Sequence, residues 1–295
     1  MKILVIGRSG QLARALAHLD PSLTFWGRDA LDLADPGPVG ERIAAFAPDL
    51  VINAAAYTAV DQAESEREMA FAVNEAGVGA VAEAAAGAGA PLIHVSTDYV
   101  YPGAGDRPYR ETDETAPVNV YGASKLAGEQ AALAANPRTA ILRTAWVYAP
   151  WGKNFVRTML RLARNRDALR IVADQRGQPT SALDLARACL AIAPRLAAAA
   201  ADDPVWGPTH FAGAGPTTWA DFAAAIFAKA EGSLIERAPR IERIGTADYP
   251  TPAARPANST LDLARFEHLF GFAPRGWPEA LEETLGMITV EDLEA

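Results

Sequence analysis

The chain opens with Met1-Lys2-Ile3-Leu4-Val5-Ile6-Gly7-Arg8-Ser9-Gly10-Gln11-Leu12-Ala13, in which an apolar run leads into two closely spaced glycines. Residues 3–6 form a continuous apolar run, which predicts a buried strand, and residues 11–18 have the spacing of an amphipathic helix. Glycines between a strand and a helix let the backbone approach a pyrophosphate, and the start of the helix offers N–H groups to anionic oxygens. The stretch therefore predicts a dinucleotide-binding turn that includes Gly7 and Gly10, with a plain tight turn as the alternative.

The end of the second predicted strand bears on which dinucleotide is bound. In an NAD site an acidic residue about 20 residues beyond the turn accepts the ribose hydroxyls. Here residues 23–26 read as the strand, Gly27 stands where the acid is expected, and Arg28 follows. An arginine at this point can pair with a 2′-phosphate, so the sequence favours NADPH, with NADH possible; a solvated loop arginine is the alternative. We expect Asp32 and Leu33 to border the adenine.

Short apolar runs alternate with helical patterns through the first half of the chain. Such alternation is typical of βαβ units with right-handed crossovers, and it predicts an α/β fold with a Rossmann-type doubly wound parallel sheet. The predicted strands include residues 50–52, 92–96 and 139–142, and the predicted helices include residues 64–86 and 121–135.

The pattern changes near residue 150. Residues 155–164 predict a helix, residues 175–180 a loop, and residues 206–215 and 249–258 are rich in Pro, Gly and aromatic side chains. We therefore expect a dinucleotide-binding Rossmann domain over residues 1–150. Residues 151–295 are expected to form mainly a smaller substrate-binding lobe, interleaved with the end of the sheet.

Composition narrows the class of protein. A formal charge of -9 argues against a nucleic-acid partner, which would require clustered Lys and Arg. The single cysteine, Cys189, allows no internal disulfide and lies in an apparent amphipathic helix, so we expect a buried thiol and a cytoplasmic protein. We find no signal peptide and no apolar window of about 18 residues, which predicts no membrane span.

Tyr121 and Lys125 form a candidate acid/base pair. They are four residues apart in a segment that reads as a helix start, so their side chains would share one helix face. An ammonium beside a phenol favours the phenolate, which can exchange a proton with a carbonyl or alcohol oxygen. A surface tyrosine beside a solvated lysine is the alternative.

His94, inside an apolar strand, is interpreted as a core histidine, and no histidine shows metal-ligand spacing.

Several motifs in order resemble those of one known group of enzymes. The set resembles the extended short-chain dehydrogenase/reductase superfamily and, within it, the dTDP-4-dehydrorhamnose reductase family. The matching segments are Gly10-Gln11-Leu12, residues 53–61, Ser96-Thr97-Asp98-Tyr99-Val100, Asn119-Val120-Tyr121-Gly122, residues 143–148, residues 175–180 and residues 255–259.

The resemblance implies a role for each matching residue. Thr97, Tyr121 and Lys125 would be catalytic: Thr97 would hydrogen-bond the substrate carbonyl, Tyr121 would donate a proton, and Lys125 would bind the nicotinamide ribose. Residues expected to line the cofactor are Gly10, Gln11, Leu12, Ala55, Ala56, Tyr57, Tyr121 and Lys125. Substrate contacts are expected from Thr97, Asp98, Trp146, Asn154 and Arg255; bracing of a Pro-rich loop is the alternative for Arg255, and core packing for Trp146.

Two departures from related patterns limit what the resemblance implies. Some relatives bind magnesium through glutamates between two subunits, but the matching positions here hold Ala15 and Leu183. The sequence therefore argues against magnesium, or any metal, and favours a monomer or a weak homodimer. Sugar-nucleotide dehydratases have an Asp-Glu pair where this chain has Asp98-Tyr99, which argues against dehydration chemistry.

The expected activity is NAD(P)H-dependent reduction of dTDP-4-dehydro-L-rhamnose to dTDP-L-rhamnose, in deoxysugar synthesis for cell-surface polysaccharide. Two alternatives remain open at this point. The chain can act on another sugar nucleotide, as a 4-keto reductase or an epimerase, since a fold alone does not select a substrate. It can also be a non-catalytic dinucleotide-binding regulatory subunit, similar to those of methionine adenosyltransferase, although a scaffold has no need of Thr97, Tyr121 and Lys125 together.

Overall fold

A six-stranded parallel sheet forms the centre of the computed structural model, which describes residues 1–293. Its strand order is β10-β5-β4-β3-β1-β2, and each neighbouring pair runs parallel. The strands are β1 (Ile3–Ile6), β2 (Thr24–Trp26), β3 (Leu50–Asn53), β4 (Leu92–Thr97), β5 (Thr139–Thr144) and β10 (Gly207–His210). The predicted doubly wound α/β fold is confirmed, and the five strands predicted from apolar runs are all present.

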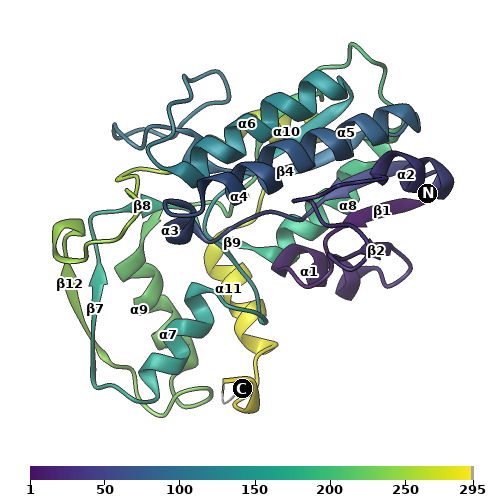
Figure 1. Cartoon of the computed structure of the whole chain (residues 1–295). Helices are drawn as coiled ribbons and strands as arrows, with labels where there is room; N and C mark the ends of the chain where they lie inside the picture. Colours follow the sequence, from purple (N-terminus) through teal and green to yellow (C-terminus); the bar gives the residue numbers. More distant parts are fainter. Residues whose placement is uncertain (294–295) are drawn as a thin grey trace.

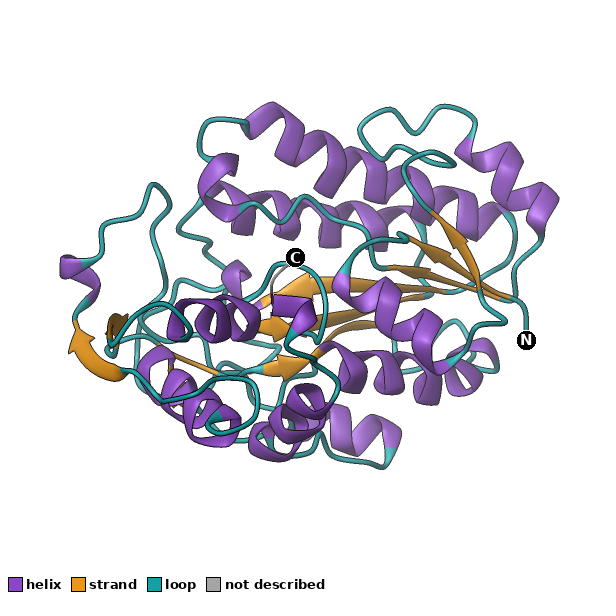
Figure 2. Ribbon diagram, turned by 90° about the horizontal axis from the view of Figure 1, so that it is seen from below, coloured by secondary structure: helices purple, strands orange, loops and turns teal. Residues whose placement is uncertain are grey.

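Helices cover both faces of this sheet (Figures 1 and 2). One layer holds α2 (Val39–Phe46), α5 (Gly77–Gly87) and α6 (Val120–Ala135), and the other holds α1 (Gln11–Leu19) and α8 (Ala182–Ala197). Because both faces are covered, the central strands are buried along their whole length and can be apolar throughout. Cys189 lies buried in α8, as expected, and burial raises the pKa of its thiol to about 12.

The strand order places a crevice at the carboxyl ends of β1 and β3. After β1 the chain moves to β2 on one side, and from β3 onward it builds the sheet on the other side. The connections leave these strands in opposite directions, and open α/β sheets bind ligands at such a switch point.

The second half of the chain contributes to the core of the main sheet and also forms a core of its own. β10, α8 and α10 (Ala264–Phe270) join the main sheet and its apolar core. A separate apolar core forms among α7 (Phe155–Ala163), α9 (Trp219–Ala230), α11 (Trp277–Gly286) and the parallel pair β7 (Ala168–Val172) and β12 (Arg240–Ile244), seen to the lower left in Figure 1. The chain also forms two short strand pairs. β6 (Val147–Tyr148) pairs in parallel with β9 (Thr180–Ser181), and β8 (Arg176–Gly177) pairs antiparallel with β11 (Thr217–Thr218).

Three segments differ from the sequence predictions. The helix expected over residues 64–86 begins as α4 at Arg67 and, after Phe71, continues through a π-helical segment, Ala72–Ala76, before α5. In that segment the Asn74 side chain hydrogen-bonds both the N–H and the C=O of Tyr57 and also the Ser124 hydroxyl. The expected loop over residues 175–180 contains β8 and the start of β9, and residues 207–210 supply the sixth strand of the sheet.

The remaining short elements are α3 (Val60–Ala63) and the 3-10 turns η2 (Asp98–Val100), η3 (Thr246–Asp248) and η4 (Glu291–Leu293). Within residues 1–293, no helix has the length and apolar character required to cross a bilayer.

Candidate active site

A cavity of about 840 Å³ occupies the crevice at the carboxyl ends of the parallel strands. It brings together residues that are far apart in the sequence. The predicted site residues that line it are Gly7, Gly10, Gln11, Leu12, Arg28, Asp32, Leu33, Ala55, Ala56, Thr97, Asp98, Tyr121, Lys125 and Trp146.

The glycine turn has the backbone geometry that a pyrophosphate site requires. Gly7 has a φ of +114°, and a Cβ atom there would lie 3.3 Å from the backbone of Ala54, so this position favours glycine on both counts. Gly10 is the N-cap of α1 and supplies no capping side chain, and the first turn carries no acidic residue. The first N–H groups of α1 are therefore available to anionic oxygens, with the positive end of the helix dipole behind them.

Buried polar atoms without partners mark where a ligand would bind. Among residues 1–293, Oε1 of Gln11, Oδ2 of Asp98 and Oγ1 of Thr144 are buried in the cavity wall and have no hydrogen-bond partner. Each such atom costs about 1–3 kcal/mol when it stays unpaired. A polar ligand in the cavity would remove that cost, so these residues fit a dinucleotide and a sugar nucleotide. Thr144 was not among the predicted site residues. Its place at the end of β5, within the matching segment 143–148, is the signal that could have identified it.

Arg28 lies at the edge of the cavity beside the expected adenosine end. Its side chain is 77% exposed and lies 3.7 Å from a carboxylate oxygen of Asp32. An exposed ion pair of this kind contributes roughly 0–1 kcal/mol, so it holds the guanidinium only weakly. Gly27, where an NAD site has an acidic residue, offers no carboxylate to the ribose hydroxyls.

Close packing of α6 on η2 places Tyr121 beside Thr97. Asn119 caps α6 by accepting a hydrogen bond from the N–H of Gly122 at 2.8 Å. A Cβ atom at Gly122 would lie 2.2 Å from the carbonyl oxygen of Tyr99, so only glycine permits this approach of helix and turn. The half-buried ring of Tyr121 packs edge-on against the Tyr99 ring at 5.9 Å and faces the cavity with Thr97, at the end of β4.

Lys125 lies one turn further along α6 and is buried. Its Nζ donates a hydrogen bond to the carbonyl oxygen of Val95 at 2.8 Å and lies 3.4 Å from Nε2 of His94. Burial lowers the pKa of Lys125 to about 8, although the carboxylate of Glu129 acts in the opposite direction.

Tyr121 does not have the lowered pKa that its spacing from Lys125 predicted, and the pKa of Asp98 is shifted as well. Burial raises the pKa of Tyr121, the Thr97 hydroxyl opposes that rise, and the Asp98 charge adds to it. Burial also raises the pKa of Asp98 to about 7, against the influence of the Thr97 and Ser259 hydroxyls. Oγ1 of Thr97 donates to Oδ1 of Asp98 at 2.8 Å. In the absence of a ligand, Tyr121 is therefore a neutral phenol with a proton to donate.

The sequence is closely similar to those of known proteins. It matches the family model described as RmlD substrate binding domain over residues 1–290. It is 46% identical over 298 residues to the dTDP-4-dehydrorhamnose reductase of Sinorhizobium fredii, and the alignment covers 100% of both chains. The chain belongs to the dTDP-4-dehydrorhamnose reductase family.

Solved members of the family have the same fold. The dTDP-4-dehydrorhamnose reductase from Clostridium acetobutylicum is 35% identical with a TM-score of 0.89, over 97% of this chain and 99% of that one. The enzyme from Bacillus anthracis, solved in complex with NADP, is 34% identical with a TM-score of 0.88, over 96% of this chain and 99% of that one. Likeness at this level over whole chains shows that family membership extends to both halves of the molecule.

Three residues predicted from the family resemblance lie outside the cavity wall. The Tyr57 hydroxyl donates to Glu66 at 2.9 Å. The Asn154 side chain caps α7 and donates to the carbonyl oxygens of Ala149 and Trp151. The guanidinium of Arg255 pairs with Asp61 at 2.9 Å. In this unliganded arrangement the side chains of Asn154 and Arg255 brace loops near the site.

Ala15 and Leu183, at the positions where some family members are expected to hold magnesium ligands, are buried in the apolar core of α1 and α8. Neither side chain can bind a cation. Across residues 1–293 there is also no cluster of three or more His, Cys, Asp or Glu side chains placed to hold a metal.

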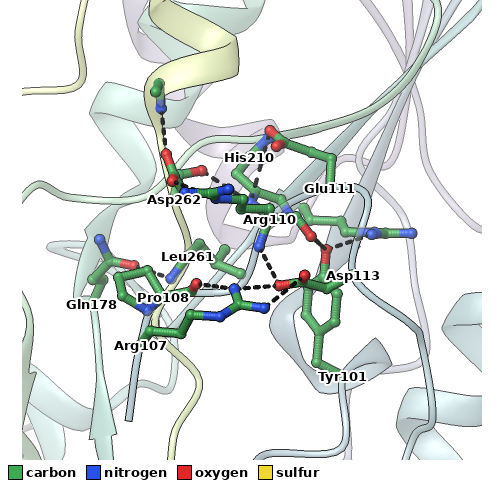
Figure 3. A network of polar contacts seen from close by, with 12 residues as sticks. Tyr101, Arg107, Pro108, Arg110, Glu111, Asp113, Gln178, His210, Leu261 and Asp262 are labelled. Carbon is green, nitrogen blue, oxygen red and sulfur yellow. Dashed lines mark hydrogen bonds and ion pairs between the residues drawn. The ribbon is translucent and has the colours of Figure 1, made fainter. Parts of the chain in front are cut away.

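A polar network fastens the segment that follows η2 in this family member (Figure 3). The Tyr101 hydroxyl lies 2.7 Å from Nε2 of His210 and 3.0 Å from the carbonyl oxygen of Arg110, and His210 Nδ1 lies 3.0 Å from the carbonyl oxygen of Asp262. The N–H of His210 donates to Glu111 at 3.0 Å. The network ties Tyr101, which follows η2, to residues 110–111, to β10 and to Asp262.

Proposed function

We propose that the protein reduces dTDP-4-dehydro-L-rhamnose to dTDP-L-rhamnose with NADPH, as its family membership indicates. The observation that carries the proposal is the meeting of Thr97, Tyr121 and Lys125 in one cavity with the glycine turn of α1. A binding subunit without catalysis has no use for this arrangement, because a phenol with a proton to donate contributes nothing to holding a dinucleotide.

Each residue has a task in the reduction. The bound dinucleotide supplies the hydride that is added to the carbonyl carbon. As negative charge grows on the carbonyl oxygen, the Thr97 hydroxyl donates a hydrogen bond to it and the Tyr121 hydroxyl protonates it. Lys125, one helical turn away, would hold the nicotinamide ribose and favour the tyrosinate that remains. We assign the pyrophosphate to Gly7, Gly10, Gln11 and the first N–H groups of α1, and the 2′-phosphate to Arg28.

The sugar nucleotide is assigned to the side of the cavity that faces the second half of the chain. Trp146 and Asp98 line the cavity there, together with Trp219. Arg255 reaches the diphosphate in this proposal only if its ion pair with Asp61 opens. We propose a cytoplasmic enzyme that acts without nucleic acid or membrane partners, as a monomer or weak homodimer, with residues 1–150 binding the dinucleotide and residues 151–295 mainly the sugar.

The test is to follow nicotinamide absorbance with dTDP-4-dehydro-L-rhamnose as substrate, comparing NADPH with NADH. We expect turnover with a preference for NADPH and a loss on the order of 10²–10⁴-fold in kcat for Tyr121→Phe. The Tyr99→Phe variant is the matched control, since Tyr99 packs against the Tyr121 ring from η2.

If NADP⁺ binds and no turnover occurs, the assignment of this substrate is wrong. Turnover with a different 4-keto sugar nucleotide would then indicate another reductase of the same fold. No turnover with any of them would indicate a regulatory subunit.

A further inference from the structure

Three buried polar side chains lie in a row from the end of β3 to Lys125, the proposed catalytic lysine. Asn53, at the end of β3, places Nδ2 3.3 Å from Nδ1 of His94 in β4. On the other side of the ring, Nε2 of His94 lies 3.4 Å from Nζ of Lys125. Asn53 is 1% exposed, His94 0% and Lys125 2%, so no solvent separates these groups.

The orientation of the Asn53 amide determines which ring nitrogen of His94 carries a hydrogen atom. Oδ1 of Asn53 accepts a hydrogen bond from the N–H of Ala55 at 3.1 Å, so the other end of the amide, a pure donor, faces His94. Nδ1 of His94 must therefore accept and carries no hydrogen. Burial and the charge of Lys125 hold the pKa of His94 well below its usual value, so the ring is neutral and its hydrogen is on Nε2.

This tautomer turns a donor toward Lys125. An ammonium at Nζ has only donors, so it finds no acceptor in the His94 ring and is bonded by the carbonyl oxygen of Val95 at 2.8 Å. A neutral amine has a lone pair that faces the Nε2–H group. The geometry therefore disfavours the charged form of Lys125 beyond the effect of burial.

The charged groups around Lys125 do not compensate for this. Glu129, on the same helix, favours the ammonium, but its carboxylate is already bound by Arg143 of β5 at 2.6 Å and by the Ser96 hydroxyl of β4 at 2.5 Å. The other ionisable groups beside the site, Tyr121 on α6 and Asp98 in η2, both have pKa values raised by burial. The ammonium is therefore incompletely satisfied by the protein alone, and a hydroxyl group in the cavity would complete its hydrogen bonding.

We propose that His94 is a positioning residue for Lys125: held by Asn53 with its hydrogen on Nε2, it faces the lysine with a donor and leaves Nζ short of acceptors until a bound dinucleotide offers its ribose hydroxyls. Cofactor binding is then coupled to uptake of a proton at Nζ. The inference rests on the proposed function, because it takes the ribose hydroxyls to lie against Lys125.

The tautomer of His94 can be measured on the unliganded protein. The chain has four histidines, so selective ¹⁵N labelling and long-range ¹H–¹⁵N spectra resolve each ring, and the His94→Gln variant identifies the His94 signals. We expect a neutral ring with hydrogen on Nε2 between pH 6 and pH 9. A ring with its hydrogen on Nδ1 would overturn the inference.

The coupling is tested by calorimetric titration of NADP⁺ at pH 8 in buffers of different ionisation enthalpy. The wild-type protein is expected to take up a fraction of a proton per site, because burial lowers the pKa of Lys125 toward that pH. Lys125→Met should abolish the uptake. His94→Met should reduce it, because a thioether offers no N–H group to the lone pair of Lys125, so the amine loses its partner and the lysine is more fully charged in the free protein. His268→Met, at an exposed position on α10, is the matched control.

The outcomes separate this inference from the function on which it rests. Equal proton uptake by the wild-type and His94→Met proteins, with normal NADP⁺ affinity, overturns the role of His94 and leaves the proposed function standing. Proton uptake that is as large in the Lys125→Met protein as in the wild type also overturns the role of His94 and leaves the proposed function standing. NADP⁺ that fails to bind overturns the proposed function and the coupling together.

Discussion

The indole of Trp146 lies face to face with the indole of Trp219, with ring centroids 3.5 Å apart and planes inclined by 9°. The two rings come from different parts of the sequence, and both line the cavity. Trp146 has a φ of +47°, a left-handed conformation that costs roughly 1–2 kcal/mol in a residue with a side chain. The stacked pair holds that conformation and forms an aromatic wall on the side of the cavity assigned to the sugar.

Replacing Trp219 tests whether this wall binds substrate. Trp219→Ala removes the stacking partner of Trp146, and aromatic pairs contribute about 0.5–1.5 kcal/mol beyond their buried area. We expect KM for the sugar nucleotide to rise on the order of tenfold, with little change in the Kd for NADP⁺, measured by steady-state kinetics and fluorescence titration. Trp219→Phe should retain most of the affinity. An unchanged KM for Trp219→Ala would assign the pair to packing alone.

Replacing Gly177 is a second test of whether the Trp146–Trp219 pair binds substrate. A Cβ atom at this position would lie 2.3 Å from the Trp146 ring, so Gly177→Ala forces the indole to move. We expect a rise in KM comparable to that of Trp219→Ala. Combining the two changes should add little, since both act on the position of one ring. Fully additive losses would show that Gly177 has a separate role.

Thr97 is the second test of the proposed chemistry. Its hydroxyl donates to Oδ1 of Asp98 in the structure and would turn to the carbonyl oxygen of a bound substrate. Removal of one such donor typically lowers kcat on the order of 10²-fold. Thr97→Val should therefore reduce kcat by about that factor, and Thr97→Ser should restore most of it. Because Oγ1 also accepts a hydrogen bond from the N–H of Tyr99, the melting temperature of both variants must be compared with that of the wild type. Loss of activity in both variants alike would point to a structural role.

The fold could be predicted from the sequence because the signals that decide it are local. The apolar run of residues 3–6 and the glycine turn lie next to each other, and the later strands each show as a short apolar run. The sixth strand, β10, was not predicted because it contains Pro208 and begins at Gly207, residues that read as loop. An edge position tolerates the missing N–H of Pro208.

The site was predictable only where its residues lie in contiguous motifs. Thr97, Tyr121 and Lys125 came from such motifs, and the structure gathers them in one cavity. Trp219 could not be found in this way, because its place depends on how α9 packs against distant segments. Thr144 lies in the matching segment 143–148, but that resemblance implied no role for it. His94 was interpreted as a core histidine; it is buried, but its contact with Lys125 depends on the register of β4 against α6, which no local spacing reveals.

In the proposed site, Arg28 would pair with the 2′-phosphate and so set the preference for NADPH over NADH. Arg28→Ala removes the guanidinium that would pair with the 2′-phosphate, and hydrogen bonds to a charged group contribute about 1.5–3 kcal/mol. We expect kcat/KM for NADPH to fall roughly 10–100-fold while the value for NADH changes little. Arg166→Ala, an exposed arginine in the other lobe, serves as the control for loss of one positive charge. An equal fall with both cofactors would contradict recognition of the 2′-phosphate.

Asp98 makes stability depend on pH in a defined direction. Burial raises the pKa of its carboxyl to about 7, above the 3.8 expected for an unfolded chain. Between these values the folded protein retains a proton that the unfolded chain has released. The stabilising contribution of that proton is complete below the unfolded pKa and is lost as the pH rises through about 7. Asp98→Asn removes the titration and keeps the size of the side chain.

We therefore expect the Asp98→Asn protein to gain stability relative to the wild type as the pH rises, by roughly 2–3 kcal/mol between pH 5 and pH 8. Urea unfolding of both proteins at these two pH values measures the difference. Asp35→Asn, at an exposed position, should track the wild type at both. If the wild-type and Asp98→Asn proteins instead keep a constant difference, Asp98 is ionised in the folded state throughout this range. It would then meet a bound sugar as a carboxylate that only accepts hydrogen bonds, rather than as a group that can donate one.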